Sequence, residues 1–546
     1  MPDQPVARQA GGTKPALWWM AMALAAAAML APLFLVDVPP LLDYPNHLAR
    51  LFVLSAVPGD AVLGRMYAPD WHILPNLAID LIFPPLMHLL SVHTVGRVLL
   101  GFILLLNLAG IAAYHRAVFG SVSLWTSAAA LAGINGVFLL GFLNYEVSQG
   151  LAFLAAAGWI CLHQRRPLAA ALFGVAVIPA LFFSHLMGAM LFLLLIGSAE
   201  VALLWPRLFR TGRWVALLRA AAMVLPPAAA GAALYAAAPL SDVTESPVWM
   251  PLKGKLAMLL MPFQNGYALW FDILTAAAVA GFLLGCLLAR RGRIAPKAVA
   301  AFTIIAVLYP LAPSAYNGVG FPDLRLPVML GFLLFAGFRP ARLGRLAGWI
   351  AVAGFGTLLL ARAALVSVVW HAHAGDLADL RQVLAAVSPG DRVASITLPN
   401  SKVPGRYDIG TRDFPDHWRN VARRHLGTGD YDPHIAALAV IERRAFWPLL
   451  FSDPTQQPIR MQPGYDLLKA RGLPEYVDLV ALRHGEGPLV GAPNPFCGFD
   501  HLLALVGGAD PAARSLAPAW LKMESRTDTA VLYRVSGCPG VPGAGG

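Results

Sequence analysis

Long apolar runs separated by short basic loops constrain this chain more than any other feature of its sequence. Of its 546 residues, 58% are hydrophobic and only 13% are charged, whereas a soluble domain carries about 25% charged residues. Crossing a bilayer core takes about 20 apolar residues in a helix. The sequence therefore predicts a multi-pass α-helical membrane protein with about eleven spans, at 16–36, 98–114, 121–140, 146–162, 167–183, 185–206, 214–238, 273–289, 298–314, 326–338 and 346–368.

The basic loops predict how these spans are oriented. Arginine and lysine residues gather between alternate pairs of spans, near 165–166, 207–213, 290–297 and 339–345. Because short loops rich in Lys and Arg stay in the cytoplasm, we expect the N-terminus inside and the chain after the last span outside. The net charge of +11 then follows from membrane topology and does not call for a nucleic-acid partner.

The same alternation assigns the segment after the first span. Counting the apolar stretch 77–92 as a span would place every basic loop on the wrong side, and its Asp80 and His88 suit a bilayer centre poorly. Residues 37–97 are therefore expected to form one long extracytoplasmic loop with helices at the membrane interface. Ten of the twelve carboxylates before residue 370 fall on this outer side, which ordinary solvated loops or an active site would explain.

Beyond residue 370 the composition changes to that of a compact domain. A helix over 375–388 and strands over 391–398, 477–482, 521–525 and 529–535 are predicted there. This divides the chain into a transmembrane domain (1–370), an extracytoplasmic α/β domain (371–537) and a disordered Pro/Gly-rich tail (538–546). Cys161 and Cys286 are expected to be small core residues of spans, whereas Cys497 and Cys538 lie on the outer side, where a disulfide is left open.

The segment directly after the first span is the most informative: Pro40-Leu41-Leu42-Asp43-Tyr44-Pro45-Asn46-His47. A helix that starts near Tyr44 places Asp43, His47 and Arg50 on one face. A carboxylate, an imidazole and a guanidinium at a membrane surface are suited to an acceptor hydroxyl and a lipid phosphate. An ordinary helix start explains the same residues, with Asp43 as N-cap and Arg50 reaching the lipid headgroups.

This segment resembles the P-x-x-D-E-x-x-Y/H pattern of the lipid A aminoarabinose and protein mannosyltransferase branches of the GT-C superfamily. The spacing of Asp43, His47 and Arg50 also resembles the first-loop motif of oligosaccharyltransferase catalytic subunits. These membrane glycosyltransferases use polyprenyl-phosphate-linked sugars and carry an acidic residue in the first extracytoplasmic loop. The long first loop, the many spans and the outer C-terminal domain match that plan. Two departures are that no second acid adjoins Asp43 and that no WWDYG-like motif is present.

The resemblance implies an inverting glycosyltransferase of a bacterial inner membrane, with its C-terminal domain in the periplasm. Asp43 would be the general base, supported by His47, and Asp37 is the second choice for that role or for a divalent metal, whose requirement is left open. The implied partners are a polyprenyl-phosphate-linked sugar, membrane lipid, and an unidentified glycan, lipid or protein acceptor.

Other residues predicted on the outer side are candidates for substrate contacts. A Trp–His pair suits stacking on a sugar, and a cation at the outer surface suits the phosphate of a lipid donor. For each, a structural role in the aromatic belt, in packing or in snorkelling is the alternative. The candidates are Arg50, Asp70, Trp71, His72, Asn144, Tyr145, Glu146, His185, Lys253 and Arg325.

Two other functions compete with sugar transfer. A transporter or lipid flippase would place charged residues near the bilayer midplane, whereas ionisable residues within the predicted spans are few. A non-catalytic assembly protein would use the membrane part only to present its C-terminal domain to a partner.

Overall fold

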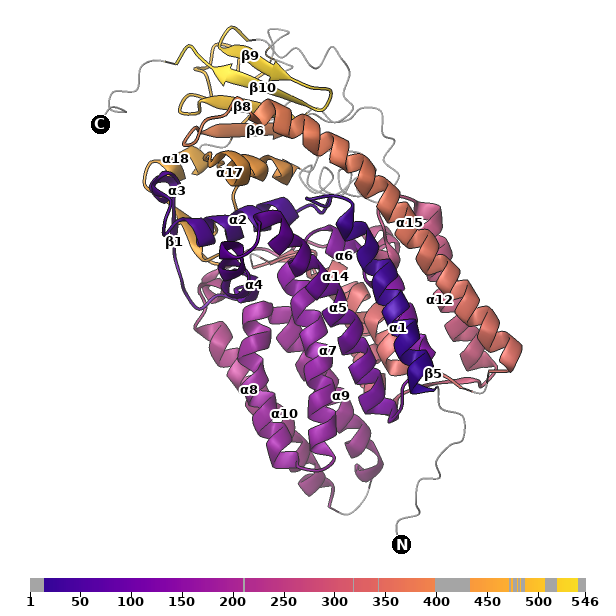
Figure 1. Ribbon diagram of the computed structural model, residues 1–546. Coiled ribbons are helices and arrows are strands. Elements are labelled where there is room, and N and C mark those ends of the chain that lie inside the picture. Colours follow the sequence, from indigo (N-terminus) through magenta and orange to yellow (C-terminus); the bar gives the residue numbers. More distant parts are fainter. Residues whose placement is uncertain are drawn as a thin grey trace.

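The computed structural model describes residues 14–209, 212–317, 319–341, 343–397, 433–470, 473–474, 479, 482, 487–505 and 518–538. These residues form a bundle of long helices with a small mixed sheet at one end (Figure 1). Predicted features at 398, at 477–478 and 480–481, and in the tail 539–546 lie outside the described residues. Leu479 and Leu482 are helical, so the structure does not support the strand predicted over 477–482.

Among the described residues, eight helices are long and apolar enough to cross a membrane. They include most of the predicted spans, whereas two further predicted spans are shorter helices of 16 residues each, α13 (Pro296–Leu311) and α14 (Pro322–Gly337). The chain is thus a multi-pass helical membrane protein, and its described residues contain fewer helices of full spanning length than the eleven spans predicted. The eight are α1 (Pro15–Leu30) with η1 (Ala31–Phe34), α5 (Val92–Phe119), α7 (Leu143–His163), α8 (Pro167–Ser184), α9 (Leu186–Leu204) with η4 (Trp205–Arg207), α10 (Arg213–Ala236), α12 (Leu269–Leu288) and α15 (Arg345–Leu384).

The predicted span 121–140 is wrong as a continuous helix. It is divided into the 3-10 helix η3 (Leu124–Ala132) and the short helix α6 (Gly136–Leu139). The Asn135 side chain caps α6 by accepting from the backbone N–H groups of Val137 and Phe138 at 2.9 and 3.0 Å. Its amide nitrogen donates to Glu146 at 3.0 Å. Hydropathy misses this break because the residues on both sides are apolar and the polar cap is satisfied inside the protein.

Several short helices and the short strand β1 (Tyr67–Pro69) lie between α1 and α5. The helices are α2 (Tyr44–Ala56), α3 (Ala61–Met66), α4 (Ala78–Ile82) and η2 (Pro84–His88). Helix α2 begins at the predicted residue, with Pro45 in its first turn. It is covered by the C-terminal part of the chain, because the Asn46 side chain bonds the backbone of Leu449 and of Phe451, each at 2.8 Å.

The C-terminal part contains a four-stranded sheet in the order β6 (Val393–Thr397), β8 (His501–Leu505), β10 (Ala530–Val535) and β9 (Leu521–Arg526). Strand β6 pairs parallel with β8, and the other pairs are antiparallel. The short strand β7 (Ile459–Met461) pairs antiparallel with β1 (Tyr67–Pro69) of the first loop. Cys497 and Cys538 form a disulfide with a Cα–Cα distance of 5.5 Å. Cys161 is exposed, which corrects its expected place in the core, whereas Cys286 is buried.

Helix α15 joins the bundle to the sheet without a break at the predicted boundary near residue 370. Its 40 residues correspond to a length of about 60 Å, twice the roughly 30 Å of a bilayer core. Its C-terminal half therefore extends beyond the membrane toward the sheet (Figure 1).

Two of the predicted basic loops meet at the other end of the bundle. Strand β2 (Gly292–Ile294) pairs with β5 (Phe338–Pro340), which places Arg293 opposite Arg339. Figure 1 shows β5 beside the start of α1, away from the C-terminal sheet. The bundle therefore has a basic end near the N-terminus and an opposite end that carries the first loop and the sheet.

Candidate active site

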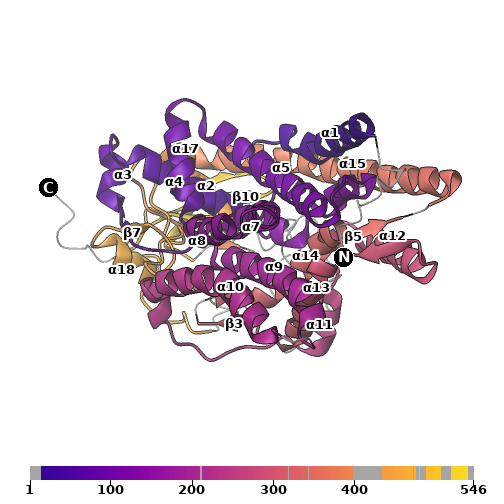
Figure 2. The same ribbon diagram turned by 90° about the horizontal axis from the view of Figure 1, so that it is seen from below.

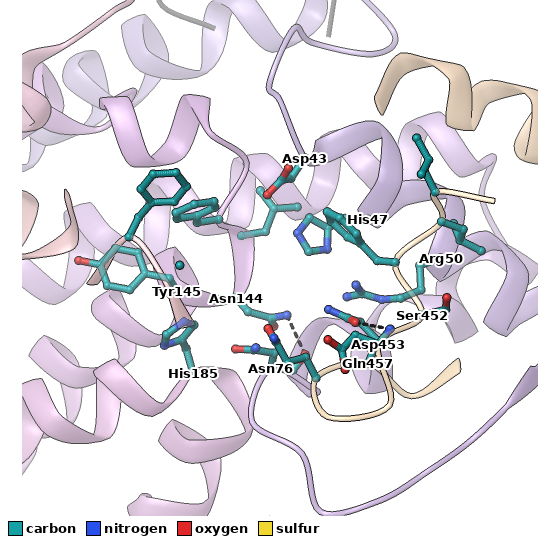
Figure 3. A pocket seen from close by; sticks show the side chains of 18 of the residues that line it. Asp43, His47, Arg50, Asn76, Asn144, Tyr145, His185, Ser452, Asp453 and Gln457 are labelled. Carbon is teal, nitrogen blue, oxygen red and sulfur yellow. Dashed lines mark hydrogen bonds between the residues drawn. The ribbon is translucent and has the colours of Figure 1, made fainter. Parts of the chain in front are cut away.

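A cavity of about 460 Å³ lies where the first loop, the bundle and the C-terminal part meet (Figure 3). Its walls come from α2, from the start of α7, from the junction of α8 and α9, from the start of α14, from the loop 449–457 and from α18 (Tyr465–Ala470). The sequence-predicted residues that line it are Asp43, His47, Arg50, Asn144, Tyr145, His185 and Arg325.

Asp43 is positioned by the backbone and not by a capping bond. It precedes α2, but its side chain makes no N-cap hydrogen bond, so the ordinary helix-start interpretation does not account for its carboxylate. Its backbone N–H donates to the carbonyl of Leu140 at 3.1 Å. Gly141 has φ +79°, and a Cβ atom there would lie 2.7 Å from the Asp43 nitrogen, so only glycine permits this approach. Asp43 Oδ1 lies 3.2 Å from His434 Nδ1.

Arg50 is held by a carboxylate of its own. Its Nε and Nη2 donate to the two oxygens of Asp80 at 2.8 and 3.0 Å, a two-pronged geometry that fixes the guanidinium. Both side chains are buried. Burial raises the pKa of the Asp80 carboxyl, and the Arg50 charge opposes that rise. Because the Asp80 carboxylate largely neutralises the Arg50 guanidinium, Arg50 shapes the wall of the cavity and adds little net positive charge to it.

His47 is uncharged in this setting. Burial, together with the charge of Arg50 and the neighbouring His434, holds the pKa of His47 well below its usual range. Its ring meets the edge of Phe451 with centroids 5.2 Å apart. Its Nδ1 atom is buried and has no hydrogen-bond partner among the described residues. A neutral imidazole beside Asp43 can donate a hydrogen bond to a substrate hydroxyl or accept one from it. Because it carries no positive charge, it does not form an ion pair with the Asp43 carboxylate.

Arg325 on α14 is the principal cation of the cavity. Its guanidinium carbon lies 4.8 Å from the ring centroid of Phe142 and 5.5 Å from that of Tyr145. Its Nε is buried without a hydrogen-bond partner, and Arg325 forms no ion pair within the described part of the chain. Asp323, two residues before Arg325, lies 3.6 Å from Lys255. A buried guanidinium with aromatic rings beside it and unused donors is suited to an anion.

The start of α7 and the start of α9 complete this side of the cavity. The Tyr145 hydroxyl lies 3.0 Å from the Arg325 carbonyl, and the His185 ring meets Tyr145 edge-on at 5.7 Å. His185 Nδ1 accepts from the Met187 N–H at 3.0 Å, which leaves Nε2–H as the donor in a neutral ring. Burial and the charge of Arg325 keep the pKa of His185 low. Asn144 donates to the Asn76 carbonyl at 2.7 Å.

The opposite wall belongs to the C-terminal part, and sequence patterns did not reveal it. Figure 3 shows Ser452, Asp453 and Gln457 across the cavity from Tyr145 and His185, with Asp43 and His47 between the two groups. Lys469 donates to the Ser452 hydroxyl at 2.8 Å. Burial lowers the pKa of Lys469, and Asp453 opposes that fall. Asn46, which anchors this loop to α2, was the only local sign of the contact.

Six predicted residues do not line the cavity. Asp37 pairs with Arg381 of α15 at 3.2 Å, and its role as a second base stays a prediction. Glu146 is fully buried and accepts from Asn107 at 2.8 Å as well as from Asn135, so its role is to join α5, α6 and α7. Lys253 is exposed. The three others form a surface group in which His72 pairs with Asp70 at 3.0 Å and Trp71 is 48% exposed.

Metal ligands are not clustered in the described residues. No three His, Cys, Asp or Glu side chains there lie close enough together to hold an ion. Near the cavity, the Asp43 carboxylate has a single described histidine partner at ion-pair distance, His434 at 3.2 Å.

The overall fold was compared with known proteins. No protein-family model matches the chain, and no curated protein matches it in sequence. Among solved structures, apo ArnT from Cupriavidus metallidurans matches with a TM-score of 0.50 and 11% identity over 95% of this chain and 98% of that one. The chain has the overall fold of ArnT. ArnT bound to undecaprenyl phosphate gives a TM-score of 0.48 at 11% identity over the same shares. The mycobacterial arabinofuranosyltransferase AftD gives 0.41 at 16% identity, covering 96% of this chain and 40% of that one.

Within this fold, the cavity lies between the first loop and the C-terminal part. Asp43 enters it from the loop that follows the first long helix, and Arg325 enters it from the bundle. The fold thus brings an acid and a cation, distant in sequence, to one polar cavity at the end of the bundle that carries the sheet.

Proposed function

We propose that this protein is an inverting glycosyltransferase that moves a sugar from a polyprenyl-phosphate donor to an acceptor at the extracytoplasmic face of the membrane. One observation carries the proposal: the Asp43 carboxylate and the Arg325 guanidinium line the same cavity. Asp43 makes no capping bond to α2, and Arg325 Nε is buried without a hydrogen-bond partner among the described residues. A base and a phosphate-binding cation are the two groups that such a transfer needs.

The chemistry follows from these two groups. An acceptor hydroxyl attacks the anomeric carbon from the face opposite the phosphate, and its proton passes to Asp43. The bond between the anomeric carbon and the phosphate oxygen breaks, and the electron pair leaves with the polyprenyl phosphate. Arg325 stabilises the charge that develops on that leaving group. Attack from the opposite face inverts the anomeric configuration.

The arrangement of charge favours the extracytoplasmic side. Arg293 and Arg339 lie together at the end of the bundle near the N-terminus, and basic loops of this kind remain cytoplasmic. The cavity lies at the other end, beside the part of the chain that carries the Cys497–Cys538 disulfide, and disulfides persist in oxidising compartments.

A reconstitution experiment tests the proposal. The purified full chain in vesicles is given a panel of polyprenyl-phosphate hexoses and pentoses together with a membrane extract as acceptor source. We expect release of free polyprenyl phosphate and transfer of the sugar with inversion. Movement of the intact sugar lipid across the vesicle bilayer, without cleavage of the sugar–phosphate bond, would instead support the transporter or flippase alternative.

Gly141→Ala is expected to lower both the unfolding temperature and the transfer rate. A left-handed φ costs a non-glycine residue roughly 1–2 kcal/mol, and the added Cβ would displace the Asp43 backbone, 2.7 Å away. Gly120→Ala is the matched control, because Gly120 has φ +71° but a Cβ atom there would meet no other atom within 4 Å. The unfolding temperature should fall in both variants, but the transfer rate only in Gly141→Ala; equal transfer in the two would contradict the positioning role of Gly141.

A further inference from the structure

A second cavity lies at the end of the bundle far from the candidate active site. It has a volume of about 220 Å³ and is formed by the last residues of α7 and α9, the first turns of α10 and the start of α13. Figure 2, seen from that end, shows α7, α9, α10 and α13 as neighbours. Helix α7 has Tyr145 of the first cavity near its start and His163 of the second at its end, which separates the two by about 30 Å.

This cavity carries an excess of positive charge. Arg207, Arg219 and Lys297 line it, and none of the three forms an ion pair within the described part of the chain. The one acid of the lining, Glu200, is buried and lies 2.8 Å from His163. With three cations against one acid, the lining favours an anion.

Large apolar side chains border the basic residues. Trp205, two residues before Arg207, is 64% exposed, and on α10 Trp214 and Leu218 are 67% and 71% exposed. Only 11% of the apolar window of α10 is buried inside the protein, so this helix presents most of its surface to its surroundings. Exposed tryptophans on a membrane helix mark the level of the lipid headgroups.

We propose that this cavity binds the phosphate headgroup of an anionic phospholipid from the leaflet opposite the candidate active site. Basic pockets between membrane helices recognise such headgroups, and the volume is below the roughly 300–1,000 Å³ of sites for drug-sized molecules. The exposed apolar side chains near the cations contact the acyl chains of the lipid. A soluble phosphate has no acyl chains and would not make these contacts. The bound lipid bridges α10 to α7, α9 and α13.

The test uses the full chain in a neutral detergent and needs no sugar transfer. Native mass spectrometry measures binding of phosphatidylglycerol, with phosphatidylcholine as the uncharged lipid. Arg207→Gln/Arg219→Gln removes two exposed charges, which keeps the risk to folding small. The wild type is expected to retain phosphatidylglycerol over phosphatidylcholine, and the double variant to bind phosphatidylglycerol about 30-fold more weakly. Lys297→Gln is expected to weaken binding in the same direction.

Arg291→Gln/Arg345→Gln is the matched control, because it removes two exposed charges that do not line the cavity. It should bind phosphatidylglycerol like the wild type. Equal weakening in both double variants would overturn the proposal, because it would reduce the effect to net charge. Full competition by inorganic phosphate at matched concentration would also overturn it, since the site would then belong to a soluble anion.

Discussion

Asp43→Asn is expected to slow sugar transfer about 100- to 10,000-fold, the range that removal of a general base produces. The amide has the shape of the carboxylate but cannot take the proton of the acceptor hydroxyl. The protein should remain folded, because the Asp43 side chain forms no capping bond to α2. The variant loses the pairing with His434, which at a partly exposed site contributes no more than about 1 kcal/mol.

The measurement is turnover under saturating donor, combined with the affinity for polyprenyl phosphate. A lost base lowers the turnover rate and leaves lipid affinity close to that of the wild type. Asp37→Asn is the matched control, because Asp37 pairs with Arg381 and does not line the cavity. An Asp43→Asn enzyme that keeps more than about a tenth of the wild-type turnover would contradict the assignment. A comparable loss in Asp37→Asn would move the base to that residue.

Local sequence patterns were sufficient to find one wall of the cavity. Asp43, His47 and Arg50 lie within two turns of one helix, so the periodicity of α2 alone places them together, and all three line the cavity. Their surroundings were not predictable in the same way. Arg50 pairs with Asp80, 30 residues away, although the sequence offered Asp80 only as a residue unsuited to a bilayer centre.

The opposite wall depends on contacts across most of the chain. Asn46 bonds residues that are 403 and 405 positions away, and His434 approaches Asp43 across a similar separation. No periodicity, turn signal or charge rule reports which loop of a distant domain docks on a given helix. The sequence therefore predicted that an outer domain exists without predicting that Ser452, Asp453 and Lys469 help to line the cavity.

Hydropathy predicted most of the spans because crossing a bilayer demands length and apolar character. It failed at 121–140, where Asn135 and Glu146 satisfy each other in the interior, so a break in the helix leaves no polar residue facing lipid. Hydropathy also placed Cys161 in the core, because the composition of an apolar helix does not indicate which of its faces is covered by other helices.

Arg325→Gln is expected to weaken the binding of polyprenyl phosphate about 10- to 100-fold, the loss that follows when a charge-assisted bond to phosphate is removed. The unfolding temperature should stay the same or rise. A buried guanidinium without a carboxylate partner costs desolvation energy, and a neutral side chain relieves that cost. Its contacts with the rings of Phe142 and Tyr145 offset only part of it. A variant that binds polyprenyl phosphate more weakly but unfolds at the same or a higher temperature identifies Arg325 as a ligand-binding residue.

Two further variants separate charge from geometry. Arg325→Lys keeps the positive charge but lacks the planar fork of donors, so its affinity for polyprenyl phosphate should lie between those of the wild type and Arg325→Gln. Lys253→Gln removes an exposed cation that does not line the cavity and should bind like the wild type. The measurements are lipid-phosphate affinity in nanodiscs and thermal unfolding of the same samples. Two results would contradict this assignment: unchanged affinity in Arg325→Gln, or a lowered unfolding temperature with a proportionate loss of binding. Arg325 would then be a packing residue, and the phosphate of the leaving group would have no cation assigned to it.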